Sequence, residues 1–331
     1  MLSVAATPSD AKKLGRRKKL LFSLIVAGIS AVLAFSIAET FLRIVPIPGA
    51  VFHNFYYDDV TGSRSYPHSS WVYRNDRNEY AKRKVNSWGY LDKEHEFEKA
   101  PGVTRLGFIG DSFTEARQFP LEDVFHQIIE RDVNSVFGAG AVECIAIGTM
   151  GHSTFQGYLE SQRWADSLGL DQVFYVFSEN DLGDNIPLIK RYDAIPYPII
   201  SGDTLKFDFS FRERYRYKTG RLHRAWQFLK SRSLVCGALQ SRIGLLRRRG
   251  IKLRATEADM QMSTVAEEGV IPTTIDVPSS WPDSFRVQAR EVTERVIVRW
   301  KRDVEATGRD FAIVYIPRDS EVTKPIDSQD S

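Results

Sequence analysis

Cysteine is scarce in this sequence, and neither sign of charge dominates it. Two cysteines in 331 residues exclude a small domain held together by disulfides. The 45 Lys+Arg nearly balance the 42 Asp+Glu, giving a formal charge of +3. Hydrophobic residues make up 43% of the chain, which excludes a mainly disordered protein. The sequence has no metal-binding cluster, Walker loop or three-glycine dinucleotide motif, so we expect no metal and no cofactor.

The excess of basic residues is confined to the N-terminus. The first 19 residues contain one acid, Asp10, and six cations, which are Lys12, Lys13, Arg16, Arg17, Lys18 and Lys19. The rest of the chain therefore carries a net charge of about −2. Proteins that bind nucleic acid through charge are basic in their body, so we expect no nucleic-acid partner.

One long apolar run occurs, which excludes a polytopic membrane protein. Residues 20–38 contain no charge, and a helix of this length spans about 29 Å, roughly the hydrocarbon core of a bilayer. Its apolar side chains cover every face, so we predict a membrane anchor rather than a buried helix. The preceding cations predict a cytoplasmic N-terminus and a periplasmic or extracellular body. Ser36-Ile37-Ala38 resembles a cleavage site, but apolar residues continue to Val45, which favours an uncleaved anchor.

Four apolar runs in the body predict buried strands, and helical patterns lie between them. The strands are predicted at residues 105–110, 142–148, 172–178 and 311–317, and the helices at residues 121–133, 154–167 and 285–307. Buried strands that alternate with helices indicate an α/β fold. We therefore predict a doubly wound, flavodoxin-like parallel sheet, covered by helices on both faces.

The predicted domains follow from the spacing of these runs. More than 130 residues separate the third strand from the fourth, too many for one crossover. We expect a basic head at 1–19, the anchor at 20–38, an extension at 39–103 and the main domain at 104–331, with an insertion at about 186–284. The insertion is aromatic and becomes strongly cationic from Arg242 to Arg254. It is either a lid on the substrate side or a surface elaboration with no chemical role.

Residues suited to chemistry follow the first three predicted strands. Ser112 stands at a strand-to-helix turn, where free backbone N–H groups favour an anion. Gly148 and Gly151 follow the second strand and allow a close backbone approach to a substrate. Asn180 follows the third strand and carries a side-chain amide that can donate to the same anion. Ligands of doubly wound sheets bind beyond the carboxyl ends of the strands, so these residues predict one site.

These three blocks resemble the SGNH (GDSL-like) hydrolase family. The matching features are Gly110-Asp111-Ser112, the Gly148-x-x-Gly151 loop and Asn180-Asp181, and Asn86-Ser87-Trp88-Gly89-Tyr90 resembles a stretch that precedes the first block in membrane-anchored relatives. The resemblance implies an esterase or deacetylase that works through an acyl-enzyme, with an ester-bearing small molecule, glycan or lipid as substrate. It implies that Ser112 is the nucleophile and that the Ser112 N–H, the Gly151 N–H and the Asn180 amide form the oxyanion hole.

The resemblance also implies a catalytic base that the sequence does not supply in the usual place. The family takes its Asp and His from an Asp-x-x-His block beyond the fourth strand, whereas the last histidine here is His223. Two such spacings occur elsewhere, with His95 in a charged stretch expected to be solvated and His126 in a helix, facing a neighbour or solvent. We expect His152 to line the site, and His223 to lie on the surface.

Three hypotheses account for the missing base. We favour a truncated member of an enzyme family. The second hypothesis is a binding module that kept the sheet and lost the base. The third is a polysaccharide O-acetyltransferase, since some place an Asp-x-His upstream of the serine, although the spacing from Asp92 to His95 differs from that pattern.

Overall fold

The computed structural model describes residues 16–45, 55–74, 80–239 and 283–317. The basic stretch from Arg242 to Arg254, most of the basic head and the polar C-terminal tail lie outside the described residues. The chain divides into two units, Met1–Ile47 and Pro48–Ser331, and each is described by itself.

The first unit contains a single helix in its described part, α1 (Arg16–Ile44). Its segment Arg17–Ile44 is 28 residues long and apolar enough to cross a membrane, and none of it is buried in protein. Leucine, isoleucine, valine and phenylalanine are exposed along its whole length. The prediction of an apolar helix that is long enough to cross a membrane is therefore confirmed.

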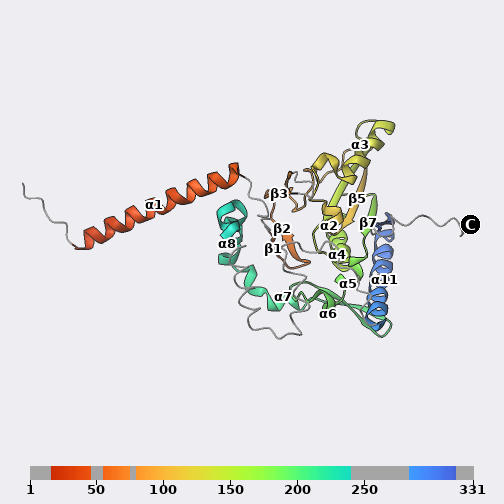
Figure 1. The fold of residues 1–331 in the computed structure, drawn as a ribbon. Helices are drawn as coiled ribbons and strands as arrows, with labels where there is room; N and C mark the ends of the chain where they lie inside the picture. The colour runs from red at the N-terminus through yellow and green to blue at the C-terminus, as the bar shows by residue number, and fades with distance from the viewer. Residues whose placement is uncertain (1–15, 46–54, 75–79, 240–282, 318–331) are drawn as a thin grey trace, which may run out of the picture. The chain divides into compact units, whose positions relative to one another are not determined.

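The second unit is built on a four-stranded parallel sheet. Its strands are β5 (Thr104–Gly110), β6 (Val142–Gly148), β7 (Gln172–Phe177) and β10 (Asp310–Tyr315), in the order β10-β7-β5-β6 (Figure 1). All four predicted strands are confirmed, and each boundary lies within two residues of its expected position. The described fold is therefore α/β with a parallel sheet.

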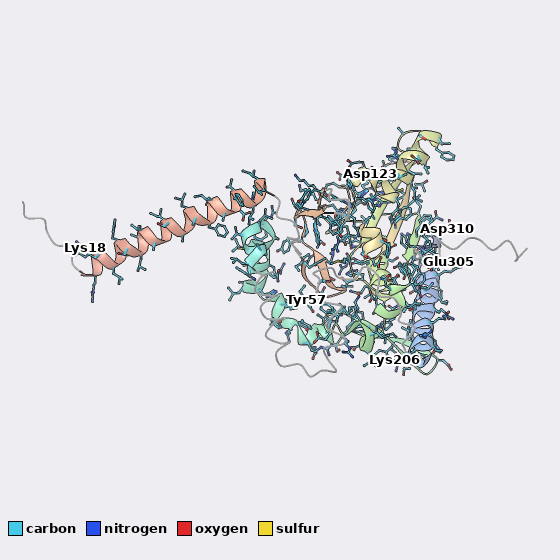
Figure 2. The ribbon with its side chains drawn as sticks, in the orientation of Figure 1. Lys18, Tyr57, Asp123, Lys206, Glu305 and Asp310 are labelled. Atoms are coloured by element: carbon cyan, nitrogen blue, oxygen red, sulfur yellow. The ribbon has the colours of Figure 1, made fainter. Side chains whose placement is uncertain are left out.

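Helices pack on both faces of this sheet because its strands alternate two sets of apolar side chains. Phe108 belongs to a cluster with side chains of α3 (Phe125–Phe137). Ile109, its neighbour on the strand, faces the other side and belongs to the main core cluster with residues of α4 (Thr154–Trp164) and α11 (Asp283–Glu305). Trp300 of α11 is fully buried in this core, with its ring centroid 4.8 Å from that of Tyr175. Side chains fill the space between the sheet and these helices (Figure 2).

The extension before the sheet contains two antiparallel hairpins. The first joins β1 (Phe55–Asp58) to β2 (Gly62–Ser65), and the second joins β3 (Ser70–Arg74) to β4 (Tyr80–Lys84). Asp58 shapes the first turn, because its carboxylate accepts the backbone N–H groups of Val60 and Thr61 and also binds Arg163 of α4. The extension is thereby attached to the main core.

Short elements lie in the described part of the segment between β7 and α11. They include α5 (Asn180–Asp184), α6 (Pro187–Lys190), β8 (Tyr197–Ser201), β9 (Thr204–Asp208), α7 (Phe211–Arg214), the 3-10 helix η2 (Arg216–Thr219) and α8 (Arg221–Arg232). β8 and β9 form an antiparallel hairpin. Phe207 packs on Phe155 of α4, with ring centroids 4.6 Å apart. Part of the predicted insertion therefore contributes to the main core.

Candidate active site

The turn after β5 holds Ser112 at the start of a short helix, α2 (Ser112–Glu115). Asp111 caps this helix, since its side chain accepts the Phe113 N–H at 2.9 Å. Asp111 is buried, and burial raises the pKa of its carboxyl group although the Asn180 hydrogen bond opposes that rise. Ser112 itself is only half-buried.

Asn180 opens α5 just beyond the end of β7 and reaches back to the first turn. Its side-chain N–H donates to the Asp111 carboxylate at 2.8 Å, while its carbonyl oxygen accepts the Ser178 hydroxyl. An amide side chain carries two N–H donors, so one remains after the bond to Asp111. The structure thus brings Asn180 against the residue that precedes Ser112, as the shared carboxyl edge of β5 and β7 requires.

Gly148 ends β6 and Gly151 lies in the loop after it, and the two glycines have different surroundings. A Cβ added at Gly148 would lie 2.4 Å from the backbone nitrogen of Glu115, so α2 packs directly on this point. Gly148 therefore allows α2 to pack closely on the end of β6. Gly151 has a φ of +74°, a conformation that favours glycine. A Cβ added there would meet only the Lys190 ammonium within 4 Å, at 3.7 Å.

Lys190 supplies positive charge at this loop. Its ammonium pairs with Asp184 at 2.6 Å, and both side chains are largely buried. Burial raises the pKa of Asp184 to about 6, although Lys190 opposes that shift. The same cation opposes the rise that burial causes in the pKa of Asp111, so its field extends to the turn that carries Ser112. The sequence analysis did not identify Lys190, because its spacing from the three blocks gives no local signal.

Glu115 is a second charged residue that the sequence analysis missed. It lies three residues after Ser112 and is buried. Burial raises the pKa of Glu115 to about 7, opposed by Arg117, Arg83 and a bond from the Met150 N–H. Its Oε2 has no hydrogen-bond partner. Glu115 is thus a buried acid at the end of α2, beside the loop that carries Gly151.

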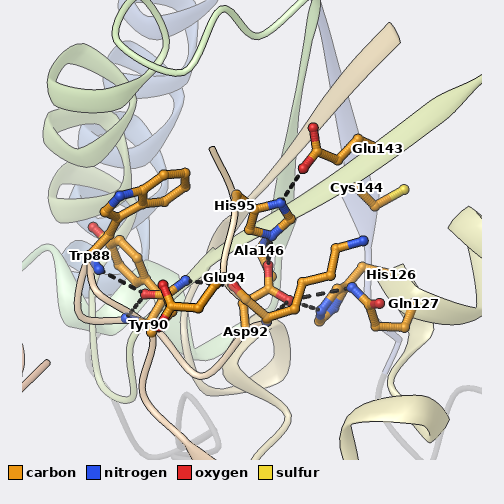
Figure 3. A network of polar contacts seen from close by, with 12 residues as sticks. Trp88, Tyr90, Asp92, Glu94, His95, His126, Gln127, Glu143, Cys144 and Ala146 are labelled. Carbon is orange, nitrogen blue, oxygen red and sulfur yellow. Dashed lines mark hydrogen bonds and ion pairs between the residues drawn. The ribbon is translucent and has the colours of Figure 1, made fainter. Parts of the chain in front are cut away.

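Two histidines converge on one buried carboxylate away from these turns. Asp92 accepts from His95 at 3.1 Å, from His126 at 3.2 Å and from the Ala146 N–H at 2.8 Å (Figure 3). His95 also contacts Glu143 through Nδ1 at 2.5 Å. The expectation of a solvated His95 is wrong, whereas His126 faces a neighbour, one of the two positions expected for it. Both side chains are fully buried, because they bind the carboxylate that covers the edge strand β6.

These contacts set the charges of the buried network. Burial lowers the pKa of His95, but its bonds to Asp92 and Glu143 outweigh burial and raise that pKa to about 9. The same bond to His95, with one from Arg105, lowers the pKa of Glu143 to about 2 despite partial burial. His95 therefore carries a proton at neutral pH and has no free ring nitrogen.

The remaining described histidines are also occupied. His152 follows Gly151 but is buried, and its Nε2 contacts the Ser63 carbonyl at 3.2 Å. Burial lowers its pKa to about 4, so it is neutral at pH 7. His68 lies beside Glu94, and His223 bonds Gln227. In the part of the chain that the structure describes, no hydrogen bond joins the Ser112 hydroxyl to a histidine.

Metal chemistry has no ligand set among the described residues, where no group of three or more His, Cys, Asp or Glu side chains could hold an ion. Both cysteines are buried and unpaired. A scan of the chain against protein-family models found no match, and a search of curated proteins found none either.

Proposed function

We propose that the chain is a membrane-anchored ester hydrolase of the SGNH type, with Ser112 as its nucleophile. The observation that carries the proposal is the hydrogen bond from Asn180 to Asp111, at 2.8 Å. It joins a candidate oxyanion donor to the residue that immediately precedes the candidate nucleophile. Ordinary turn and cap chemistry does not require such a link between two strand ends.

The order of the strands supports a site at this position. The chain passes from β5 to β6 on one side, and β7 then lies on the other side of β5. In a doubly wound, flavodoxin-like sheet, this reversal opens a crevice beyond the carboxyl ends of the strands, and ligands bind there. Ser112 and Asn180 follow the two strands that flank the reversal.

The chemistry is acyl transfer through a covalent intermediate. The Ser112 Oγ attacks the ester carbonyl, and the alcohol leaves to give an acyl-enzyme that water then hydrolyses. The Ser112 N–H, the Gly151 N–H and the second Asn180 N–H stabilise the negative charge on the tetrahedral oxygen. The Lys190 ammonium beside Gly151 adds a favourable field. Acylation also requires a base that accepts the Ser112 proton.

No base is assigned, and this favours a second candidate function. His95 and His126 bind Asp92, and His152 is buried against Ser63. A module that binds an ester or a related anion at the same crevice without hydrolysing it needs no base. Both ring nitrogens of His95 contact carboxylates, so these contacts do not support His95 as the base of an O-acetyltransferase.

The proposal includes an orientation in the membrane. Six cations precede the apolar run at 20–38, which favours a cytoplasmic N-terminus and a periplasmic or extracellular second unit. The substrate would then be an ester of a glycan, a lipid or a small molecule outside the cytoplasm.

Hydrolysis of p-nitrophenyl acetate by the full chain in detergent tests the proposal. We expect slow hydrolysis above the buffer rate that is lost in Ser112→Ala and kept in Ser135→Ala, a change at an exposed serine of α3. Equal rates for the wild type and Ser112→Ala would reject the hydrolase and favour the binding module.

A further inference from the structure

Helix α8 carries an apolar stripe that faces away from the domain. Leu222, Trp226 and Leu229 stand at i, i+4 and i+7, so they share one face of the helix. Their exposed fractions are 89%, 50% and 52%. Among the ring contacts of the described residues, none involves Trp226. Three large apolar side chains in line on a helix surface indicate a partner.

The other side of α8 is already occupied by the domain. The ring of Phe228 lies 6.4 Å from that of Tyr66, which follows β2. His223 and Gln227 line a cavity of about 480 Å³ together with Tyr56 and Tyr57 of β1, and Tyr57 can be located in Figure 2. Contacts with the first hairpin therefore fix the helix and leave the stripe on its outer side.

The stripe lies in a strongly cationic segment. Residues 211–232 contain eight Lys or Arg and one acid, Glu213. Among these cations, Arg221 and Arg224 of α8 are exposed. A helix with Trp and Leu on one face and Arg residues elsewhere on its surface is typical of segments that lie in the interface of an anionic bilayer. A protein partner would need a complementary apolar and acidic surface, whereas a bilayer supplies both properties.

A short segment of the chain joins α1 to the unit that contains α8. Ten residues separate Ile44, where α1 ends, from Phe55, where β1 begins. Ten residues span at most about 35 Å when fully extended. The β1–β2 hairpin, which α8 contacts, is thus the first described element after α1.

We propose that α8 lies in the interface of the membrane that α1 spans, with Leu222, Trp226 and Leu229 among the lipids and its cations on anionic headgroups. This second contact holds the main domain at the bilayer surface rather than on a free tether. The membrane contact of α8 does not depend on ester hydrolysis, so an experiment can reject one of the two proposals without rejecting the other.

A fluorescent probe tests the proposal on the full chain in lipid nanodiscs. Leu222→Cys is labelled with nitrobenzoxadiazole, and Arg224→Cys, about 200° further around α8, is the matched control. Cys144 and Cys236 are buried, and the labelled parent chain measures their background. Leu222 is so exposed that its replacement removes no packing.

In nanodiscs of phosphatidylcholine with phosphatidylglycerol, we expect blue-shifted emission from the probe at position 222 and strong quenching by spin-labelled lipid. We expect neither effect at position 224, and weaker effects at 222 with phosphatidylcholine alone or in high salt. Equal, water-like emission at both positions would overturn the proposal. A blue shift at 222 that grows with protein concentration without lipid would also overturn it, because the stripe would then bind a second copy.

Discussion

Asn180 donates a side-chain hydrogen bond to the carboxylate of Asp111 over 2.8 Å and so ties the end of β7 to the end of β5. Asp111 is in turn the cap of the helix that begins with Ser112. A change in the position of Asn180 would therefore alter the position of Ser112 through Asp111. The first of the changes below acts directly on this contact.

Replacing Asn180 with alanine removes a candidate oxyanion donor and leaves Asp111 without that bond. We expect the rate of Ser112 acylation to fall about a hundredfold or more, the usual cost of losing one such donor. The rate of labelling by a fluorophosphonate measures it. Asn134→Ala is the control, since Asn134 makes two hydrogen bonds with Val142 away from the site. An equal loss of rate in both variants would mean that Asn180 acts only through stability.

Gly148→Ala tests the packing of α2 on β6. The new Cβ would lie 2.4 Å from the Glu115 backbone nitrogen, which cannot rotate away. We expect a loss of about 1–3 kcal/mol or more in the free energy of unfolding. Gly107→Ala is the matched variant, because its Cβ would meet the end of the Leu170 side chain at the same 2.4 Å, and that side chain can turn aside. A smaller loss at Gly148 than at Gly107 would contradict this account of the contact.

The buried His95 makes stability depend on pH. Its pKa is about 9 in the folded chain against 6.5 ordinarily, since Asp92 and Glu143 outweigh burial. The charged His95 therefore stabilises the fold fully below pH 6.5. The free energy of unfolding falls by on the order of 3 kcal/mol as the pH rises through 9. Urea unfolding across this range should show the loss in the wild type and a flatter profile in His95→Gln. Parallel profiles would be evidence against the charged His95.

Glu115 also makes the fold less stable as the pH rises, whereas an acid whose pKa is lowered by folding does the opposite. Burial raises its pKa to about 7 from 4.5, so the folded chain binds its proton more tightly than the unfolded chain does. Stability therefore falls as the pH rises from 4.5 to 7 and stays lower above it, by on the order of 3 kcal/mol. Urea unfolding of Glu115→Gln should lack this decline. The idea fails if the variant and the wild type lose stability equally over that interval.

Local patterns were sufficient to predict the sheet and the positions of its turns. The apolar runs predicted the four parallel strands, and α4 begins at Thr154, as predicted. Ser112 and Asn180 follow β5 and β7, and parallel strands bring such residues to one edge. These features depend on periodicity and on strand order, both of which a sequence carries.

The buried polar residues could not be predicted in the same way. Asp92, His95 and His126 meet through contacts between a loop and a helix 34 residues apart, so their sequence showed only a charged stretch and an unrelated helix. The burial of Glu115 arises because Gly148 lets α2 approach β6 closely. Both outcomes depend on long-range packing, which spacing along the chain does not reveal.

The most direct test of the central claim is mass-spectrometric mapping of a fluorophosphonate adduct on the full chain in detergent. We predict one adduct, on the Ser112 hydroxyl, that is absent from Ser112→Ala and slower in Asn180→Ala. An adduct on another serine, or no adduct on a chain that unfolds cooperatively in urea, would contradict the assignment of Ser112 as the nucleophile.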